Sequence, residues 1–389
     1  MITLTAADEY MCHQMVASFD EVINTDRNWT EKSYIVVFDQ SFQVMIAIGM
    51  GKYTNRNVMD GFACVAVPGR IHNVRASREL RPSWDEIKVG PISWQIVEPP
   101  KKNRVVLGDN DQGISFDILF ESDYLPVVGN VGVRRNNGIT ANQTIRYFQP
   151  GRASGTVTVD GKTYTIARES SYAYKDRSWG VRTMTGIPNE GAFHFDEPSA
   201  LTESGLMPTP AHGGGILHGY LNLQFKDWAV STTFTQGPDG KAIASATGST
   251  EGFVVFHDGS GRAPIPIVER KLNFEFFPGT RRGKSLEAEF VLADGSTRKI
   301  SCQWRNLAWY FRAGGYFGFR GWWQGKYMGP YAIGGETLDL SDKAVRDEIY
   351  GCEEIAVECS CNGETGYGVL EPWAIGALPG YGIKAEDLG

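Results

Sequence analysis

The chain has 389 residues, of which 42% are hydrophobic, 12% aromatic and 21% charged, an ordinary balance for a globular protein of two or three domains. Its formal net charge of −7 argues against a nucleic-acid partner, because binding to phosphates needs a basic surface. No segment approaches the roughly 20 consecutive apolar residues of a membrane helix, so we expect no membrane span.

The predicted elements begin with one helix and continue almost entirely as strands. Met11, Met15 and Phe19 recur at every fourth position, which predicts a short N-terminal helix. From Ser33 onward, runs of β-forming residues alternate with short polar breaks, as in an antiparallel meander. Four Asp-Gly pairs between such runs predict type I′ hairpins, whose central residues both need positive φ: Asp160-Gly161, Asp239-Gly240, Asp258-Gly259 and Asp294-Gly295.

Near the C-terminus we expect a second helix and a last hairpin. The helix is predicted over residues 341–349, with Ser341 as its N-cap. Strand-like residues on both sides of Asn362-Gly363 predict a terminal hairpin that could close a barrel. Glycine and proline cluster at residues 148–152. We therefore expect two packed β domains, residues 1–165 and 166–389.

The cysteines and the missing motifs bear on location and cofactors. None of the six cysteines stands in a CxxC or zinc-ligand spacing, so reduced thiols and a cytoplasmic location are expected. The N-terminus lacks the basic and apolar regions of a secretory signal. The sequence contains no phosphate-binding loop, dinucleotide fingerprint, serine-hydrolase elbow or HExxH motif. We expect neither a metal nor an organic cofactor.

The stretch from Tyr172 to Arg182 carries the strongest chemical signal. Alternate residues of a β-strand share a face, so Tyr174, Asp176 and Ser178 should converge on one side. In an aromatic-lined cavity, burial would raise the pKa of Asp176 and make it a general acid, whereas a nearby Arg177 or Arg182 would keep it ionised as a base or orienter. The alternative is a structural Asp–Arg pair that joins a strand to a loop.

Three further candidates lie downstream. His194 stands between two phenylalanines and is either an acid–base group or a core histidine. The aromatic, glycine-rich residues 304–327 would line an apolar pocket or form an aromatic core; the side chains singled out are Trp309, Tyr310, Trp322 and Trp323. Glu371 follows a strand-like run and would either face a barrel interior or cap a turn.

The residues Asp176-Arg-Ser-Trp-Gly180 resemble the Asp-(His/Arg)-(Ser/Asn)-Trp-Gly signature of a lipocalin-related superfamily. Its members include hydroxyneurosporene synthase (a carotenoid hydratase), AttH-like proteins and fungal Diels-Alderases. The stretches Asn28-Trp-Thr-Glu-Lys-Ser-Tyr34 and Gly366-Tyr-Gly-Val-Leu-Glu371 resemble a bacterial branch of this group. The resemblance implies two lipocalin-like antiparallel β-barrel or half-barrel domains side by side, and cofactor-free chemistry on hydrophobic substrates. Arg177 stands where many members carry histidine.

We therefore expect a cofactor-independent hydratase or lyase, isomerase or cyclase that acts by acid–base chemistry on a terpenoid, steroid, polyketide or aromatic metabolite. The expected catalytic residues are Asp176, Tyr174 and His194. The expected substrate-binding residues are Trp179, Arg177, Arg182, Trp309, Tyr310, Trp322, Trp323 and Glu371. The alternative function is non-enzymatic binding of an apolar metabolite, and a homodimer is left open.

Overall fold

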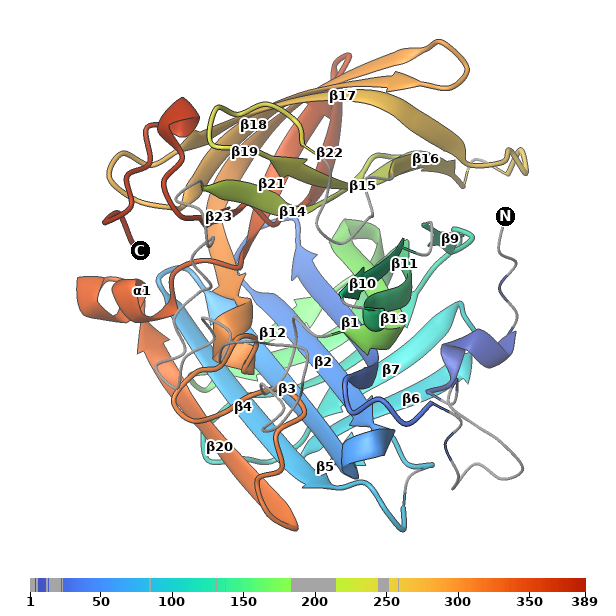
Figure 1. Cartoon of the computed structure of the whole chain (residues 1–389), viewed down its shortest axis with the longest axis vertical. Helices are drawn as coiled ribbons and strands as arrows, with labels where there is room; N and C mark the ends of the chain where they lie inside the picture. Colours follow the sequence, from blue (N-terminus) through green and yellow to red (C-terminus); the bar gives the residue numbers. More distant parts are fainter. Residues whose placement is uncertain are drawn as a thin grey trace.

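Two antiparallel sheets, one of 14 strands and one of nine, form almost all of the described chain (Figure 1). The computed structural model describes residues 4, 6–11, 13, 22, 24–83, 85–129, 132–136, 138–182, 215–243, 252–257 and 259–389. The expectation of an all-β chain with a half-barrel and a barrel side by side is confirmed.

The first sheet is open and curls into a half-barrel. Its main path runs in the order β20-β4-β3-β2-β1-β13-β11-β8-β7-β6-β5, and β9, β10 and β12 each pair with β11. Its strands are β1 (Trp29–Asp39), β2 (Met45–Tyr53), β3 (Val58–Val67), β4 (Arg70–Glu79), β5 (Lys88–Val89), β6 (Ile92–Glu98), β7 (Lys102–Leu107), β8 (Ser115–Glu121), β9 (Val127–Val128), β10 (Gly132–Asn136), β11 (Ile139–Val159), β12 (Lys162–Ile166), β13 (Ser171–Arg182) and β20 (Tyr331–Asp339).

The second sheet closes on itself, because β14 pairs with both β15 and β22. It lies above the first sheet in Figure 1. Its strands are β14 (Ile216–Gln224), β15 (Trp228–Gln236), β16 (Gly252–Phe256), β17 (Ile265–Phe276), β18 (Gly283–Leu292), β19 (Thr297–Tyr310), β21 (Glu353–Cys361), β22 (Glu364–Leu370) and β23 (Trp373–Ile375). The terminal hairpin β21–β22 thus closes the barrel as predicted.

The expected boundary at residue 165 falls before a strand of the first sheet. The motif strand β13 pairs with β1 on one side and β11 on the other. β20 comes from still later in the chain and pairs with β4. Sequence order and spatial order differ here because strands join a sheet through hydrogen bonds and shared burial, whatever their distance along the chain.

Two of the predicted turns have the geometry that type I′ needs. Asp160 and Gly161 have φ of 51° and 72°, and Asn362 and Gly363 have φ of 50° and 83°. At the other two described pairs only the glycine, Gly240 or Gly295, has positive φ, so the prediction of type I′ turns is wrong there. Asp258 lies outside the described residues.

The helices are few and short. Among the described residues the only α-helix, α1 (Lys343–Ile349), begins two residues after the predicted start at 341, because the carboxylate of Asp342 rather than the hydroxyl of Ser341 caps it by accepting from Ala344 N at 2.8 Å. At the N-terminus the structure describes only a 3₁₀ turn, η1 (Ala6–Glu9), while Met15 and Phe19 lie outside the described residues. The remaining 3₁₀ turns are η2 (Thr54–Arg56), η3 (Arg168–Ser170), η4 (Phe311–Gly314) and η5 (Pro379–Tyr381).

Three apolar cores hold these layers together. One fills the half-barrel, one fills the closed barrel, and the third joins the two sheets through residues such as Val36, Trp309 and Val369. Alternation along β1 sends Ile35 and Val37 into the half-barrel and Tyr34, Val36 and Phe38 toward the barrel. On the same face of β1, Lys32 and Tyr34 line the candidate site.

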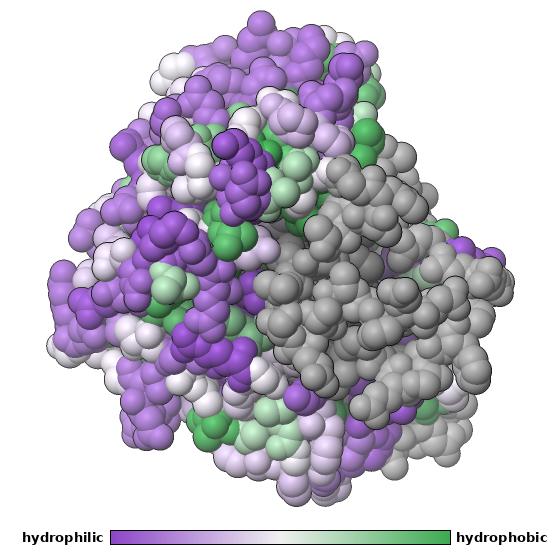
Figure 2. All heavy atoms as spheres, turned by 60° about the vertical axis from the view of Figure 1, so that its left-hand side comes forward, coloured by the Kyte–Doolittle hydropathy of each residue, from purple (hydrophilic) through white to green (hydrophobic). Residues whose placement is uncertain are grey.

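The outer surface seen in Figure 2 is of mixed polarity, and the described thiols are free. On the face shown in Figure 2, the described apolar side chains are interspersed among hydrophilic ones. Within the described part of the chain, no helix is long and apolar enough to cross a membrane. The five described cysteines are buried and free: Cys64, Cys302, Cys352, Cys359 and Cys361.

Candidate active site between the two sheets

A cavity of about 620 Å³, partly open to solvent, lies between the first sheet and the barrel. Its wall contains charged groups (Lys32, Asp60, Arg146, Asp176, Arg182 and Glu371), phenols (Tyr34, Tyr53, Tyr174, Tyr220 and Tyr316) and apolar side chains (Met50, Phe62, Phe311 and Trp373). The cavity therefore combines an apolar surface with titratable groups.

Strand alternation divides the motif strand β13 between two environments. Tyr174, Asp176 and Ser178 line the cavity together, as the period of two predicts. Lys175 and Arg177, which lie between them, are fully buried on the opposite face of the sheet.

Glycines on β2 leave room for this wall. Gly51 lies opposite Lys32, and Gly49 lies opposite Tyr34. A Cβ at Gly49 would approach the ring of Phe62 to 2.4 Å. The absence of side chains at these positions lets Phe62 pack against β2 while Lys32 and Tyr34 project from β1.

Tyr174 connects two carboxyl groups that the barrel contributes. Its Oη lies 2.7 Å from Oε1 of Glu354 and 2.9 Å from Oε1 of Glu371. A phenol has one proton to donate, so both contacts can be hydrogen bonds only if one carboxyl group donates its own proton to Tyr174. The geometry thus requires a protonated carboxyl group in this cluster.

Glu371 is the carboxyl group that keeps the proton. Glu354 Oε2 already accepts from Tyr34 Oη and, at 2.7 Å, from Trp309 Nε1, and these donors favour its charged form. Burial, followed by the nearby charge of Glu354, raises the pKa of Glu371 well above its usual value. Burial also raises the pKa of Glu354 to about 7. The donors to Glu354 and the raised pKa of Glu371 together place the proton of this cluster on Glu371, at the cavity wall.

Asp176 is placed beside an arginine that the sequence did not single out. Arg146 Nε of β11 lies 3.4 Å from Asp176 Oδ1. Neither of these two atoms has a hydrogen-bond partner among the described residues. The guanidinium of Arg146 also contacts the hydroxyl of Tyr220 and lies 4.8 Å from the centre of its ring. Asp176 Oδ1 is therefore held by the charge of Arg146 rather than by a hydrogen bond, and Asp176 lines the cavity.

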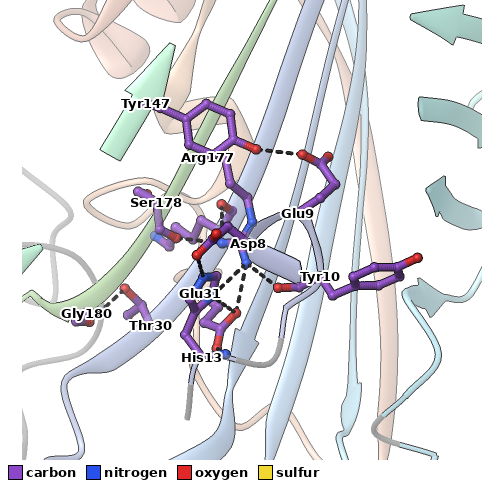
Figure 3. Close-up of polar contacts among 11 residues, drawn as sticks. Asp8, Glu9, Tyr10, His13, Thr30, Glu31, Tyr147, Arg177, Ser178 and Gly180 are labelled. Atoms are coloured by element: carbon purple, nitrogen blue, oxygen red, sulfur yellow. Dashed lines mark hydrogen bonds and ion pairs between the residues drawn. The ribbon is translucent and has the colours of Figure 1, made fainter. Parts of the chain in front are cut away.

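Arg177 anchors the N-terminal segment on the opposite face of the sheet (Figure 3). Its Nη2 donates to Glu31 Oε2 at 2.9 Å and to the carbonyl of Tyr10 at 3.0 Å. Trp179 belongs to the same cluster, because its ring stacks on His13 with centroids 3.6 Å apart. Arg177 and Trp179, expected to bind substrate, thus lie away from the cavity because odd-numbered residues of β13 face the other side.

The remaining predicted residues fall in several places. Arg182 and Glu371 line the cavity. Trp309 lies behind the wall, where it donates to Tyr34 Oη at 2.8 Å, and Tyr310 is buried elsewhere. Trp322 and Trp323 line a smaller adjoining hollow of about 230 Å³ next to Arg75. His194 lies outside the described residues.

Four charged groups of the site were missed by sequence reasoning: Lys32, Asp60, Arg146 and Glu354. Lys32 could have been found, because it lies two residues before Tyr34 in the stretch that carries the family resemblance and therefore shares its face. Asp60, Arg146 and Glu354 had no such signal, since each reaches the site only through strand pairing or packing between the sheets.

Asp60 and Lys32 form a second polar group at the cavity wall. Burial raises the pKa of Asp60 to about 6, while Gly325 N donates to its Oδ2. Burial, followed by the charge of Arg182, lowers the pKa of Lys32 well below its usual value. Among the described residues, no group of three or more His, Cys, Asp or Glu side chains could hold a metal ion.

The fold resembles that of two solved structures. One is a protein assigned as an AttH from Nitrosomonas europaea, 12% identical, with a TM-score of 0.51 over 95% of this chain and 99% of the other. The other is kievitone hydratase from Nectria haematococca, 10% identical, with a TM-score of 0.41 over 88% of each chain, which is too low to support an argument. The AttH structure confirms the fold that the sequence resemblance implied.

Sequence comparison gives the family itself. No curated protein matches this sequence. The model of the family described as "Family of unknown function (DUF8625)" matches residues 4–384. Since this match spans nearly the whole length, the chain belongs to the DUF8625 family.

Proposed function

We propose that this protein is a cofactor-independent acid–base enzyme that acts on an apolar small molecule such as a terpenoid, steroid, polyketide or aromatic metabolite. The reaction would be a hydration or its reverse, an isomerisation, or a cyclisation. The observation that carries the proposal is the contact of Tyr174 with both Glu354 and Glu371, which requires a protonated carboxyl group at the cavity wall.

Glu371 is the proposed general acid. Its O–H bond breaks as a C–H bond forms on a double bond of the substrate, and the positive charge appears on the neighbouring carbon. Asp176 and the ring faces of Phe311 and Trp373 stabilise that charge, since carboxylates and aromatic faces both attract cations. The acid is restored by the proton that the reaction releases: a proton that reaches Glu354 passes to Glu371 through Tyr174, and a proton that reaches Asp176 returns through solvent.

The fate of the cation defines the reaction class. In a hydratase, water adds to the cationic carbon and its proton passes to a carboxylate. In an isomerase, a neighbouring C–H bond gives up its proton to Asp176. In a cyclase, a second double bond of the substrate attacks the cation, and the new cation then loses a proton from a neighbouring carbon to Asp176. All three routes use the same two carboxyl groups and no redox step.

The titratable groups in the cavity wall favour an enzyme over a non-enzymatic binding protein. A carrier for an apolar metabolite gains affinity from a dry apolar pocket, and each buried acid or base in the pocket weakens it. This cavity contains Asp60, Asp176 and Glu371 among its lining residues. The free, buried thiols support a cytoplasmic location for the enzyme.

The test compares the wild type with Glu371→Gln in D₂O against panels of the four metabolite classes, with products followed by mass spectrometry. Wild type should add water, lose water or incorporate deuterium into members of one class. Glu371→Gln should lower this rate by about 10²–10⁴-fold, the usual contribution of a general acid. Glu358→Gln, on the exposed side of β21 where Glu358 pairs with Arg305, is the matched control and should retain activity.

Two results would count against the proposal. If Glu371→Gln keeps the wild-type rate, Glu371 is not the acid. If wild type retains an apolar compound tightly and converts no panel member, the protein is a binding protein.

A further inference from the structure

One end of the cavity is cationic and centred on Ser178. Lys32 of β1 and Arg146 of β11 are the register partners of Ser178 on its two sides. Neighbouring strands lie about 4.8 Å apart, so the backbones of Lys32 and Arg146 are within about 10 Å of each other. Arg182 also lines the cavity, and its Nη1 donates to Ser178 Oγ at 3.4 Å. Three basic side chains therefore surround one hydroxyl group.

Two of these side chains donate hydrogen bonds to neutral groups among the described residues. Lys32 Nζ donates to the side-chain amide oxygen of Gln324 at 2.6 Å, and Arg182 donates to the hydroxyl of Ser178. Within the described part of the chain, neither takes part in an ion pair. Arg146 has the one nearby carboxylate, Asp176.

The basic side chains outnumber the ionised acids of the cavity. Glu371 holds the proton of its pair, so Asp60 and Asp176 are the lining acids near Lys32, Arg146 and Arg182. Burial and the nearby arginines lower the pKa of Lys32, so an anion beside it would favour its charged form. Burial raises the pKa of Asp60 to about 6, so its carboxylate forms at the cost of desolvation. Arg56 adds a further positive charge close to Lys32. Buried charges without counter-ions are costly, and a bound anion would remove the cost.

We infer that the substrate carries a carboxylate group on an apolar skeleton, and that this carboxylate binds between Lys32 and Arg182 beside Ser178. The inference rests on the proposed function, whose substrate class it narrows to apolar acids. Asp176 is two residues from Ser178 on β13, a distance of about 7 Å along a strand. The reacting double bond thus lies about that far from the carboxylate carbon, toward Phe311 and Trp373.

The experiment measures binding of matched acid and alcohol pairs by isothermal titration calorimetry. Geranic acid with geraniol and citronellic acid with citronellol each share one skeleton, carry a double bond at C6, and differ at the group in question. Wild type should bind at least one acid 10-fold or more tighter than its alcohol. Lys32→Met and Arg182→Met should each weaken that acid by about 10–100-fold, as expected for loss of a charge-assisted hydrogen bond, and change alcohol binding less than 3-fold.

The controls separate this inference from the proposed function. Arg305→Met removes an exposed arginine outside the cavity and should leave acid binding unchanged. Glu371→Gln should bind the acid even where turnover is lost, so a failed anion site and a failed general acid give different results. Equal affinity for acid and alcohol in every pair, or acid binding that survives both Lys32→Met and Arg182→Met, would overturn the inference.

Discussion

Replacing Arg177 by methionine should destabilise the protein. Arg177 lies on the face of β13 opposite the cavity, where it holds the fold together and does not bind substrate. The Arg177 side chain is fully buried. It donates to Glu31 Oε2 at 2.9 Å and to the carbonyls of Lys32 and Ser178 at 3.1 and 2.9 Å. Methionine fills a similar volume but leaves the carboxylate of Glu31 and these carbonyls without the guanidinium.

The expected loss is about 3–5 kcal/mol in the free energy of unfolding, the usual result of removing one partner from a buried ion pair. Most of it comes from leaving Glu31 charged and buried, so the double variant Arg177→Met with Glu31→Gln should lose about 1–3 kcal/mol less than the sum of the two single variants. Asp176→Asn changes the neighbouring residue on the cavity face and should cost about 1–2 kcal/mol, less than Arg177→Met, because Asp176 and Arg146 are both partly exposed.

The measurement is urea unfolding at pH 7 followed by tryptophan fluorescence, with the midpoint and slope fitted for each variant. An Arg177→Met protein within about 1 kcal/mol of wild type would refute the structural assignment of Arg177. Loss of ligand binding by Arg177→Met without loss of stability would return Arg177 to the substrate-binding set.

Two further predictions concern the barrel side of the interface. Burial raises the pKa of Glu353 from 4.5 to about 8, so its contribution to stability is complete below pH 4.5 and is lost as the pH rises toward 8. Between about pH 5 and 8, Glu353→Gln should remove roughly 3 kcal/mol of this decline in the free energy of unfolding, at ~1.36 kcal/mol per pKa unit. Urea unfolding of wild type and variant across this range measures the effect. A difference between the two proteins that does not change with pH would contradict the burial of this acid. A Cβ at Gly219 would lie 1.6 Å from the carbonyl oxygen of Glu371. Gly219→Ala should therefore displace the proposed acid and cost about 1–3 kcal/mol, and a variant with wild-type stability and turnover would show that the backbone shifts without consequence.

Local patterns in the sequence determined the fold class and one face of the site. The alternation of β-forming runs predicted an all-β chain, and the hairpin turn at Asn362-Gly363 predicted the strands that close the barrel. The period of two in residues 174–178 placed Tyr174, Asp176 and Ser178 on one face, because that period is a property of extended backbone and needs no partner strand.

Only the tertiary structure decided which groups meet on that face. Asp176 lies beside Arg146 and not beside Arg177, because β11 pairs with β13 while Arg177 turns to the opposite side. Tyr174 and Glu354 are separated by 180 residues and meet because the barrel packs onto the half-barrel. Sequence period gives the side of a strand, whereas strand register and packing between sheets depend on the whole chain. The acid–base character of the cavity therefore depends on strand register and on packing between the sheets.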